Sequence, residues 1–262
     1  DDFLGGGGVV DTDIYPGVVK YAYLGKAQNS QARNLTICVT VNGNKDVTQS
    51  IWMTNRDGDV TYKDKKTKED KNLPGYTQVN ALCMLLLGKE VGELDVEEKT
   101  LSLYDFESKK EIPQAVECFT DLHGLKLNVA IQRVTVDKNK KNEQTGNYEA
   151  TGETRDENQF VKFFPEDKLV TISEVAQFVK SLGGDFDEVL KDGEINKAIE
   201  NMDGDGEYAA KWLDKNRGQT WDKSTGKSEG KSFSGGKSSG GGDSKSKPSL
   251  FDDWSKGFSL KV

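Results

Sequence analysis

The chain has 262 residues, of which 34% are hydrophobic and 31% charged, and its formal net charge is −8. Residues 215–247 hold eight Lys or Arg and three acids, a net +5, while the two acids and two lysines of residues 248–262 cancel. Residues 1–214 therefore carry −13, which argues against a protein that coats duplex DNA by charge alone but leaves room for a narrow basic groove.

The first part of the chain has the two-residue period of β-strands. Residues 1–13 include four consecutive glycines and are expected to form a flexible N-terminal arm. Strands are then expected at residues 18–26, 34–41 and 47–54, and the turn sequence Asn42-Gly43-Asn44 joins the last two.

The first of these strands has an aromatic side. Val18, Ala22 and Leu24 alternate with Tyr21 and Tyr23, so the two tyrosines are expected on the face opposite the three aliphatic residues. An aromatic outer face on a strand is unusual without a partner that covers it. The pattern favours a binding surface, and tyrosines that fill the interior of a barrel are the alternative.

The period changes after a charged loop at residues 63–72. Residues 77–87 have apolar side chains at helical spacing, with Thr77 as the expected N-cap and Gly88 as the expected stop. A polar excursion is expected at residues 137–158. Further strands are expected at 100–106, 115–120, 125–136 and 159–164.

Three strands, one helix and further strands in this order predict a mainly β fold: an OB-fold five-stranded barrel with long loop insertions, here residues 14–170. Residues 171–214 have helical periodicity and predict a small C-terminal helical appendage. Residues 215–249 predict a disordered Gly/Ser/Lys linker, because their few apolar side chains cannot offset the entropy of ordering. Residues 250–262 regain apolar side chains and predict a partner-docking tail. Its candidate partner-binding residues are Phe251, Trp254, Phe258, Leu260 and Lys261.

Motifs for catalysis or metal binding are incomplete. Cys38, Cys83 and Cys118 are far apart and odd in number, which predicts reduced thiols rather than a disulfide framework or a zinc site. The stretches at 225–228 and 203–207 resemble a phosphate loop and a calcium loop, but each lacks a required glycine. We therefore expect no enzymatic activity, no cofactor and no metal. We also expect no membrane partner, because the longest apolar run is far too short to span a bilayer.

Aromatic and cationic residues form the remaining constellation. Single strands bind where bases can stack on flat rings and cations can follow the phosphates. Binding of this kind is largely independent of base sequence. The candidate single-stranded DNA-binding residues are Tyr21, Tyr23, Arg33, Trp52, Arg56, Tyr62, Lys63, Lys65, Lys66, Tyr76 and Arg133.

Several stretches resemble a known family, the single-stranded DNA-binding proteins of N-four-like short-tailed bacteriophages, which are podoviruses with a virion RNA polymerase. The resemblance lies in Trp52-Met53-Thr54-Asn55-Arg56-Asp57-Gly58-Asp59-Val60-Thr61-Tyr62-Lys63, Lys65-Lys66, Leu73-Pro74-Gly75-Tyr76, Asn80-Ala81-Leu82-Cys83 and Phe163-Phe164-Pro165. It covers residues 15–215 and the composition of the tail. The chain ends in Leu260-Lys261-Val262, whereas bacterial single-strand binders end in acids and a terminal aromatic residue.

This resemblance implies an OB-fold protein of the infected bacterial cytoplasm that acts in phage DNA replication and recombination. It also implies activation of transcription by the phage virion RNA polymerase and by host RNA polymerase. The implied partners are single-stranded DNA, these two polymerases, and replication and recombination proteins. The alternative is an OB-like protein-interaction module without DNA binding.

Overall fold

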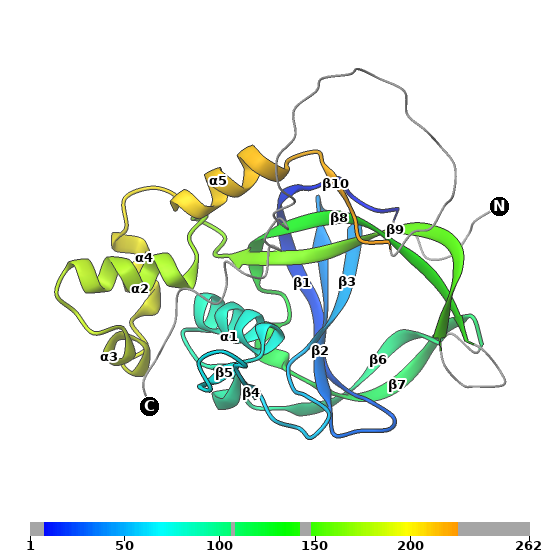
Figure 1. The fold of residues 1–262 in the computed structure, drawn as a ribbon. Coiled ribbons are helices and arrows are strands. Elements are labelled where there is room, and N and C mark those ends of the chain that lie inside the picture. Colours follow the sequence, from blue (N-terminus) through cyan, green and yellow to red (C-terminus); the bar gives the residue numbers. More distant parts are fainter. Residues whose placement is uncertain (1–7, 106–107, 142–147, 225–262) are drawn as a thin grey trace, which may run out of the picture. The chain divides into compact units, whose positions relative to one another are not determined.

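The computed structural model describes residues 8–105, 108–141 and 148–224. The fold is mainly β, as expected, with one large and largely antiparallel sheet (Figure 1). The elements are β1 (Asp13–Lys26), β2 (Arg33–Val41), β3 (Lys45–Trp52), β4 (Thr61–Lys63), β5 (Asp70–Asn72), α1 (Pro74–Leu87), η1 (Val91–Glu93), β6 (Glu97–Asp105), β7 (Lys110–Cys118), η2 (Thr120–Leu122), β8 (Lys126–Lys141), β9 (Tyr148–Phe164), α2 (Ile172–Ser181), α3 (Phe186–Lys191), α4 (Ile195–Asn201), α5 (Glu207–Asn216) and β10 (Thr220–Asp222).

Strand β1 is the centre of the sheet and carries two branches on one of its edges. Along the other edge it pairs with β2, which in turn pairs with β3. On the branched edge, Asp13–Val18 pairs with β8, and Tyr23 and Leu24 pair with β7. Strand β6 extends the sheet from β7, and β9 extends it from β8. One continuous surface therefore runs across β3, β2, β1, β7 and β6.

A β-bulge at Lys20 changes the expected faces of β1. The register shifts between Val19 and Tyr21, so Val19 and Ala22 are both buried in the core although they are three positions apart. Val18 is 38% exposed and lies on the same outer face as Tyr21. The expected grouping of Val18 with Ala22 is therefore wrong, because a bulge inserts one residue into the alternation of a strand.

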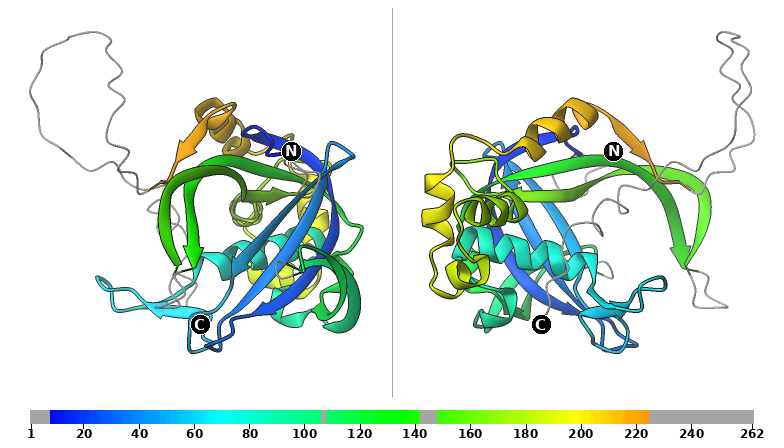
Figure 2. Two further views of the ribbon diagram at one scale, coloured as in Figure 1. Left: turned by 90° about the vertical axis from the view of Figure 1, so that its right-hand side faces the viewer. Right: turned by 60° about the vertical axis from the view of Figure 1, so that its left-hand side comes forward.

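The main core lies between the inner face of the sheet and α1. Leu35 and Ile37 of β2 are fully buried there with Val79 and Leu82 of α1. The opposite side of α1 packs against α2 and α4, where Leu85 joins a second apolar cluster (Figures 1 and 2). Helix α1 thus lies between the inner face of the sheet and the later helices, so α1 does not cover the outer face of β1, β2 and β3.

Helix α5 packs on another part of the sheet. Trp212 and Ala209 of α5 form a third apolar cluster with Ala130 of β8 and Phe164 of β9. Helix α2 is stabilised at its start by a capping box between Thr171 and Glu174. The expected helical segment is therefore present, and its helices share apolar clusters with α1 and with the sheet.

The start of α1 lies against the end of β3. The helix begins at Pro74 rather than after Thr77, because proline has a preset backbone angle and its missing N–H costs nothing in the first turn. It ends before Gly88 as expected, and Gly88 adopts a left-handed conformation with φ of 67°. A Cβ added to Gly75 would lie 2.0 Å from the carbonyl oxygen of Trp52, so only glycine allows this approach.

Three segments are more ordered than the sequence predicts. Val10 lies in the expected flexible arm, yet it is buried and exchanges two hydrogen bonds of 2.8 Å with the Asn158 side chain. The expected polar excursion contains the ends of β8 and β9. The first residues of the expected linker complete α5 and form β10, where Trp221 pairs with Val134. Each segment pairs with distant backbone or side chains, which local composition does not reveal.

Candidate nucleic-acid interface

Side chains form rows across the outer face of β1, β2 and β3. The strand register gives three successive rows: Tyr21, Cys38 and Thr48; Tyr23, Thr36 and Ser50; Gly25, Asn34 and Trp52. The middle strand contributes only short side chains, and these are buried. Larger aromatic rings lie on the flanking strands β1 and β3. An extended ligand that crosses β2 would therefore contact aromatic side chains on both sides.

The aromatic side chains differ in exposure. Tyr21 and Tyr23 are half-buried, and their ring centroids are 5.9 Å apart. Burial raises the pKa of Tyr21 to about 12, and its hydroxyl lies 3.4 Å from Thr48 Oγ1. Trp52 is 49% exposed, so its indole is more accessible than the rings of Tyr21 and Tyr23. Neutral, accessible rings are the chemistry that stacking of bases requires.

The end of the sheet near Trp52 also carries two arginines. The backbone N–H groups of Met53 and Thr54 both donate to the carbonyl of Arg33. The N–H of Gln31 donates to the carbonyl of Arg56 over 3.0 Å. These bonds fix the segment after β3 beside the start of β2, so Arg33, Trp52 and Arg56 come from adjacent backbone.

The expected charged loop contains a small β-hairpin, β4–β5, rather than an irregular segment. Asp64 holds its turn by accepting the N–H groups of Thr67 and Lys66 at 2.9 and 2.8 Å and the Lys71 ammonium at 2.9 Å. These three hydrogen bonds hold the pKa of the Asp64 carboxyl well below its usual range. The candidate residues on this hairpin, all exposed, are Tyr62, Lys63, Lys65 and Lys66.

Tyr76 does not belong to this face. It lies in the first turns of α1, is half-buried, and packs against the main core. Burial raises the pKa of its phenol. We therefore assign Tyr76 to the core and omit it from the proposed interface.

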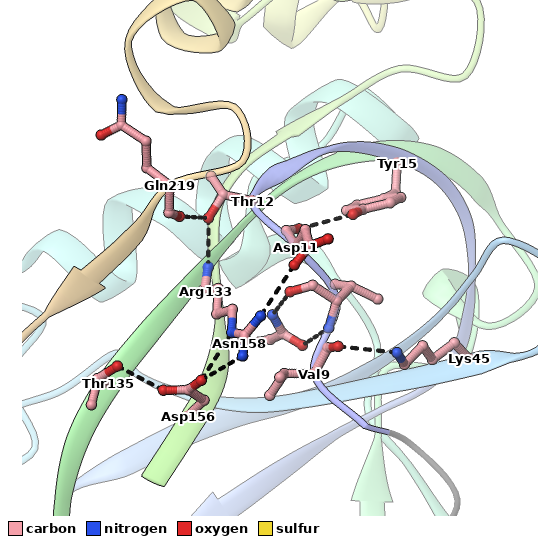
Figure 3. A network of polar contacts seen from close by, with 11 residues as sticks. Val9, Asp11, Thr12, Tyr15, Lys45, Arg133, Thr135, Asp156, Asn158 and Gln219 are labelled. Atoms are coloured by element: carbon pink, nitrogen blue, oxygen red, sulfur yellow. Dashed lines mark hydrogen bonds and ion pairs between the residues drawn. The ribbon is translucent and has the colours of Figure 1, made fainter. Parts of the chain in front are cut away.

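Arg133 lies elsewhere on the sheet, where it ties the N-terminal segment to β8 and β9 (Figure 3). Its Nε and Nη2 donate to Asp156 Oδ2 at 3.0 and 2.7 Å, and its Nη1 lies 3.2 Å from Asp11 Oδ1. Its backbone N–H donates to the buried hydroxyl of Thr12. Because two carboxylates hold the Arg133 guanidinium, its role here is structural. We therefore also omit Arg133 from the proposed interface.

The sequence did not reveal that β6 and β7 extend the same face. Tyr23 pairs with Cys118, and Cys118 pairs with Glu97, so alternate residues of β6 share the side of Tyr23. Lys99 lies on this side, whereas Tyr104 lies on the opposite one. The two pairs between β1 and β7 connect distant segments and leave no periodic signal in the sequence.

Two lysines of this face are already paired with carboxylates, and so is Arg33 beside it, whose Nη1 lies 3.2 Å from Glu117 Oε2. Lys20 Nζ lies 2.5 Å from Asp46 Oδ2, and Lys99 Nζ lies 2.8 Å from Glu97 Oε2. Burial acts to raise the pKa of Asp46, but hydrogen bonds from Lys20 and Thr40 outweigh it and leave that pKa below its usual range. The hydrogen bond from Lys99 likewise lowers the pKa of Glu97, so Asp46 and Glu97 are both ionised at neutral pH and compete with any other anion for these two lysines.

Comparison with models of protein families found none that matches this chain. A search of curated proteins also found no match. Within the ranges that the structure describes, no group of three or more His, Cys, Asp or Glu side chains is placed to hold a metal ion. Over the same ranges, no helix is both long and apolar enough to cross a membrane.

Proposed function

We propose that this chain is a sequence-independent single-stranded DNA-binding protein, with its DNA site on the outer face of β1, β2 and β3. The observation that carries the proposal is the arrangement of Tyr21, Tyr23 and Trp52 on both sides of the short side chains of β2. Each stacked base contributes about 1–3 kcal/mol, and duplex DNA is rejected because its bases are not available for stacking. The exposed lysines of the β4–β5 hairpin supply cations for the phosphates.

We further propose that the sheet is a partly open OB-fold barrel. Its five strands would follow one another in the order β1, β2, β3, β9 and β8. Gln49 of β3 accepts a hydrogen bond from the backbone N–H of Phe160 in β9, and Gln78 of α1 donates to the Phe160 carbonyl at 2.9 Å. The Gln49 bond spans the interval between β3 and β9, and the Gln78 bond ties α1 to β9. Helix α1 lies between β3 and β8 in the chain, the place that the OB-fold gives its helix.

The resemblance to the phage proteins supports a role in DNA replication, in recombination, and in transcription by the virion and host RNA polymerases. We propose these processes, in the cytoplasm of the infected host, as the setting of the DNA-binding activity. The candidate partner-binding residues Phe251, Trp254, Phe258, Leu260 and Lys261 lie outside the described residues, so their role stays a prediction.

A second candidate is an OB-like module that binds only protein. The pairing of Lys20 and Lys99 with carboxylates favours it, and so does the net charge of −13 on residues 1–214. Such a module would bind DNA weakly and with little dependence on salt, whereas a DNA site that contacts phosphates must lose affinity as salt rises.

The first prediction concerns strand preference and follows from the exposed ring of Trp52. Titration with oligo-dT should quench the intrinsic tryptophan fluorescence and give an affinity at least about tenfold above that for a duplex of equal length. The affinity for oligo-dT should fall as salt is raised. Equal affinity for the two forms would contradict the proposal, and weak binding that ignores salt would favour the protein-binding alternative.

A further inference from the structure

We propose that Asp46 and Glu97 act as built-in competitors of DNA phosphate, occupying the lysines of the binding face until a strand displaces them. This inference rests on the proposed function and assigns to these two acids the control of affinity and of its salt dependence. The side chains of both pairs are accessible to a DNA strand, because the lysine and the acid of each pair are between 41% and 55% exposed.

The Lys20–Asp46 pair lies directly beside the aromatic rows. Asp46 is opposite Thr40, whose neighbour on β1 is Val18, so this row precedes the row of Tyr21. The bulge puts Lys20 next to Tyr21 in the chain, and its ammonium crosses β2 to reach Asp46 on β3. Thr40 Oγ1 also donates to Asp46 Oδ1 at 2.6 Å, which fixes the carboxylate in place.

The Glu97–Lys99 pair flanks the other side of the tyrosines. Its two residues lie on the side of the β6–β7 hairpin that is continuous with Tyr23. A strand that stacks on the tyrosines therefore has an internally neutralised lysine on each side of its path. Both pairs join residues of the binding face itself.

Pairing of a lysine with a carboxylate lowers the free energy that a phosphate contact with this lysine contributes to binding. A free lysine that neutralises a phosphate releases the counterion condensed on that phosphate. Lys20 must first give up Asp46, so it exchanges one oxyanion for another. The net gain from phosphate contacts is then small, and binding depends more heavily on stacking of bases. A ligand that offers phosphates without accessible bases, such as duplex DNA, is disfavoured for the same reason.

The test is Asp46→Asn, which keeps an oxygen for Thr40 but removes the charge. Freeing Lys20 should tighten binding of oligo-dT about fivefold at 0.1 M salt, the effect of one added phosphate contact on an exposed lysine. The logarithm of the affinity should also fall more steeply with the logarithm of salt, by about 0.7. The double variant Lys20→Gln with Asp46→Asn should lose this added slope.

The matched control is Glu194→Gln, which changes the net charge equally and frees Lys197 on α4, away from the face. It should leave affinity and salt slope unchanged. Equal effects of the two single variants would overturn the inference, because the cause would then be overall charge. Unchanged or weaker binding by Asp46→Asn would also overturn it. Glu97→Gln is a second variant that should act in the same direction, and thermal melting verifies the fold of each variant.

The two proposals fail in distinguishable ways. A wild-type protein that does not prefer oligo-dT to duplex would contradict the proposed function itself. A wild-type protein that binds oligo-dT normally, with Asp46→Asn indistinguishable from it in affinity and in salt slope, would contradict only the role of the carboxylates.

Discussion

Replacement of Trp52 by alanine is expected to weaken binding of oligo-dT by roughly 5- to 150-fold, because loss of one stacking ring costs about 1–3 kcal/mol. Trp52 is 49% exposed and points away from the core, so thermal stability should change little. Anisotropy of a labelled oligonucleotide gives the affinity without relying on the removed fluorophore.

Tyr104→Ala is the matched control for this variant. Tyr104 is also an exposed aromatic residue, 37% accessible, but it lies on the opposite side of the β6–β7 hairpin from Tyr23. Its replacement should leave the affinity for oligo-dT within about twofold, a difference below roughly 0.5 kcal/mol. If both variants bind equally well, Trp52 is not a stacking ring and the proposed face is wrong.

Replacement of Gly75 by alanine is expected to produce the largest loss of stability among these variants, about 3 kcal/mol or more in the free energy of unfolding. The added Cβ would lie 2.0 Å from the Trp52 carbonyl oxygen and 2.9 Å from its carbonyl carbon. These are backbone atoms and cannot rotate away, so α1 must move off the end of β3. The core between α1 and the sheet would open with it.

Urea denaturation of Gly75→Ala and Gly92→Ala measures this effect. Gly92 is the control because a Cβ there would meet no atom within 4 Å, and its replacement should be close to neutral. The Gly75 variant should also bind oligo-dT more weakly, since the added Cβ presses on the backbone that carries Trp52. Equal stability of the two variants would show that α1 is not held against β3 in the way described here.

The sequence predicts the buried residues of an element well where one face of that element is buried along its whole length. Leu35, Ile37 and Val39 alternate along the strand expected at residues 34–41, and all three are fully buried. Gly88 ends α1 as expected, because a left-handed residue is a local requirement. Strict periodicity and local backbone geometry are encoded within a few residues, so they can be read from the chain alone.

The sequence predicts poorly where distant segments decide the structure. The bulge at Lys20 depends on how β1 pairs with β2, which the sequence of β1 alone does not show. For this reason Val18 lies on the outer face with Tyr21 and not on the inner face with Ala22. For the candidate site, Arg133 looked like a phosphate contact only because Asp156 and Asp11 are remote in sequence. Tyr76 looked like a stacking ring because helical packing is invisible in a short motif. Trp52 and the β4–β5 lysines kept the exposure that the sequence suggested.

Photo-crosslinking of the wild-type protein to a single-stranded oligonucleotide containing 5-bromodeoxyuridine tests most directly where DNA binds. Mass spectrometry of the crosslinked peptides should identify segments that contain Tyr21 or Tyr23, Trp52, and Tyr62, because these rings lie on or beside the proposed path. An excess of unlabelled oligo-dT should abolish the crosslinks. Crosslinks confined to helices α2 to α5, with none on β1 or β3, would contradict the assignment of the outer sheet face as the DNA site.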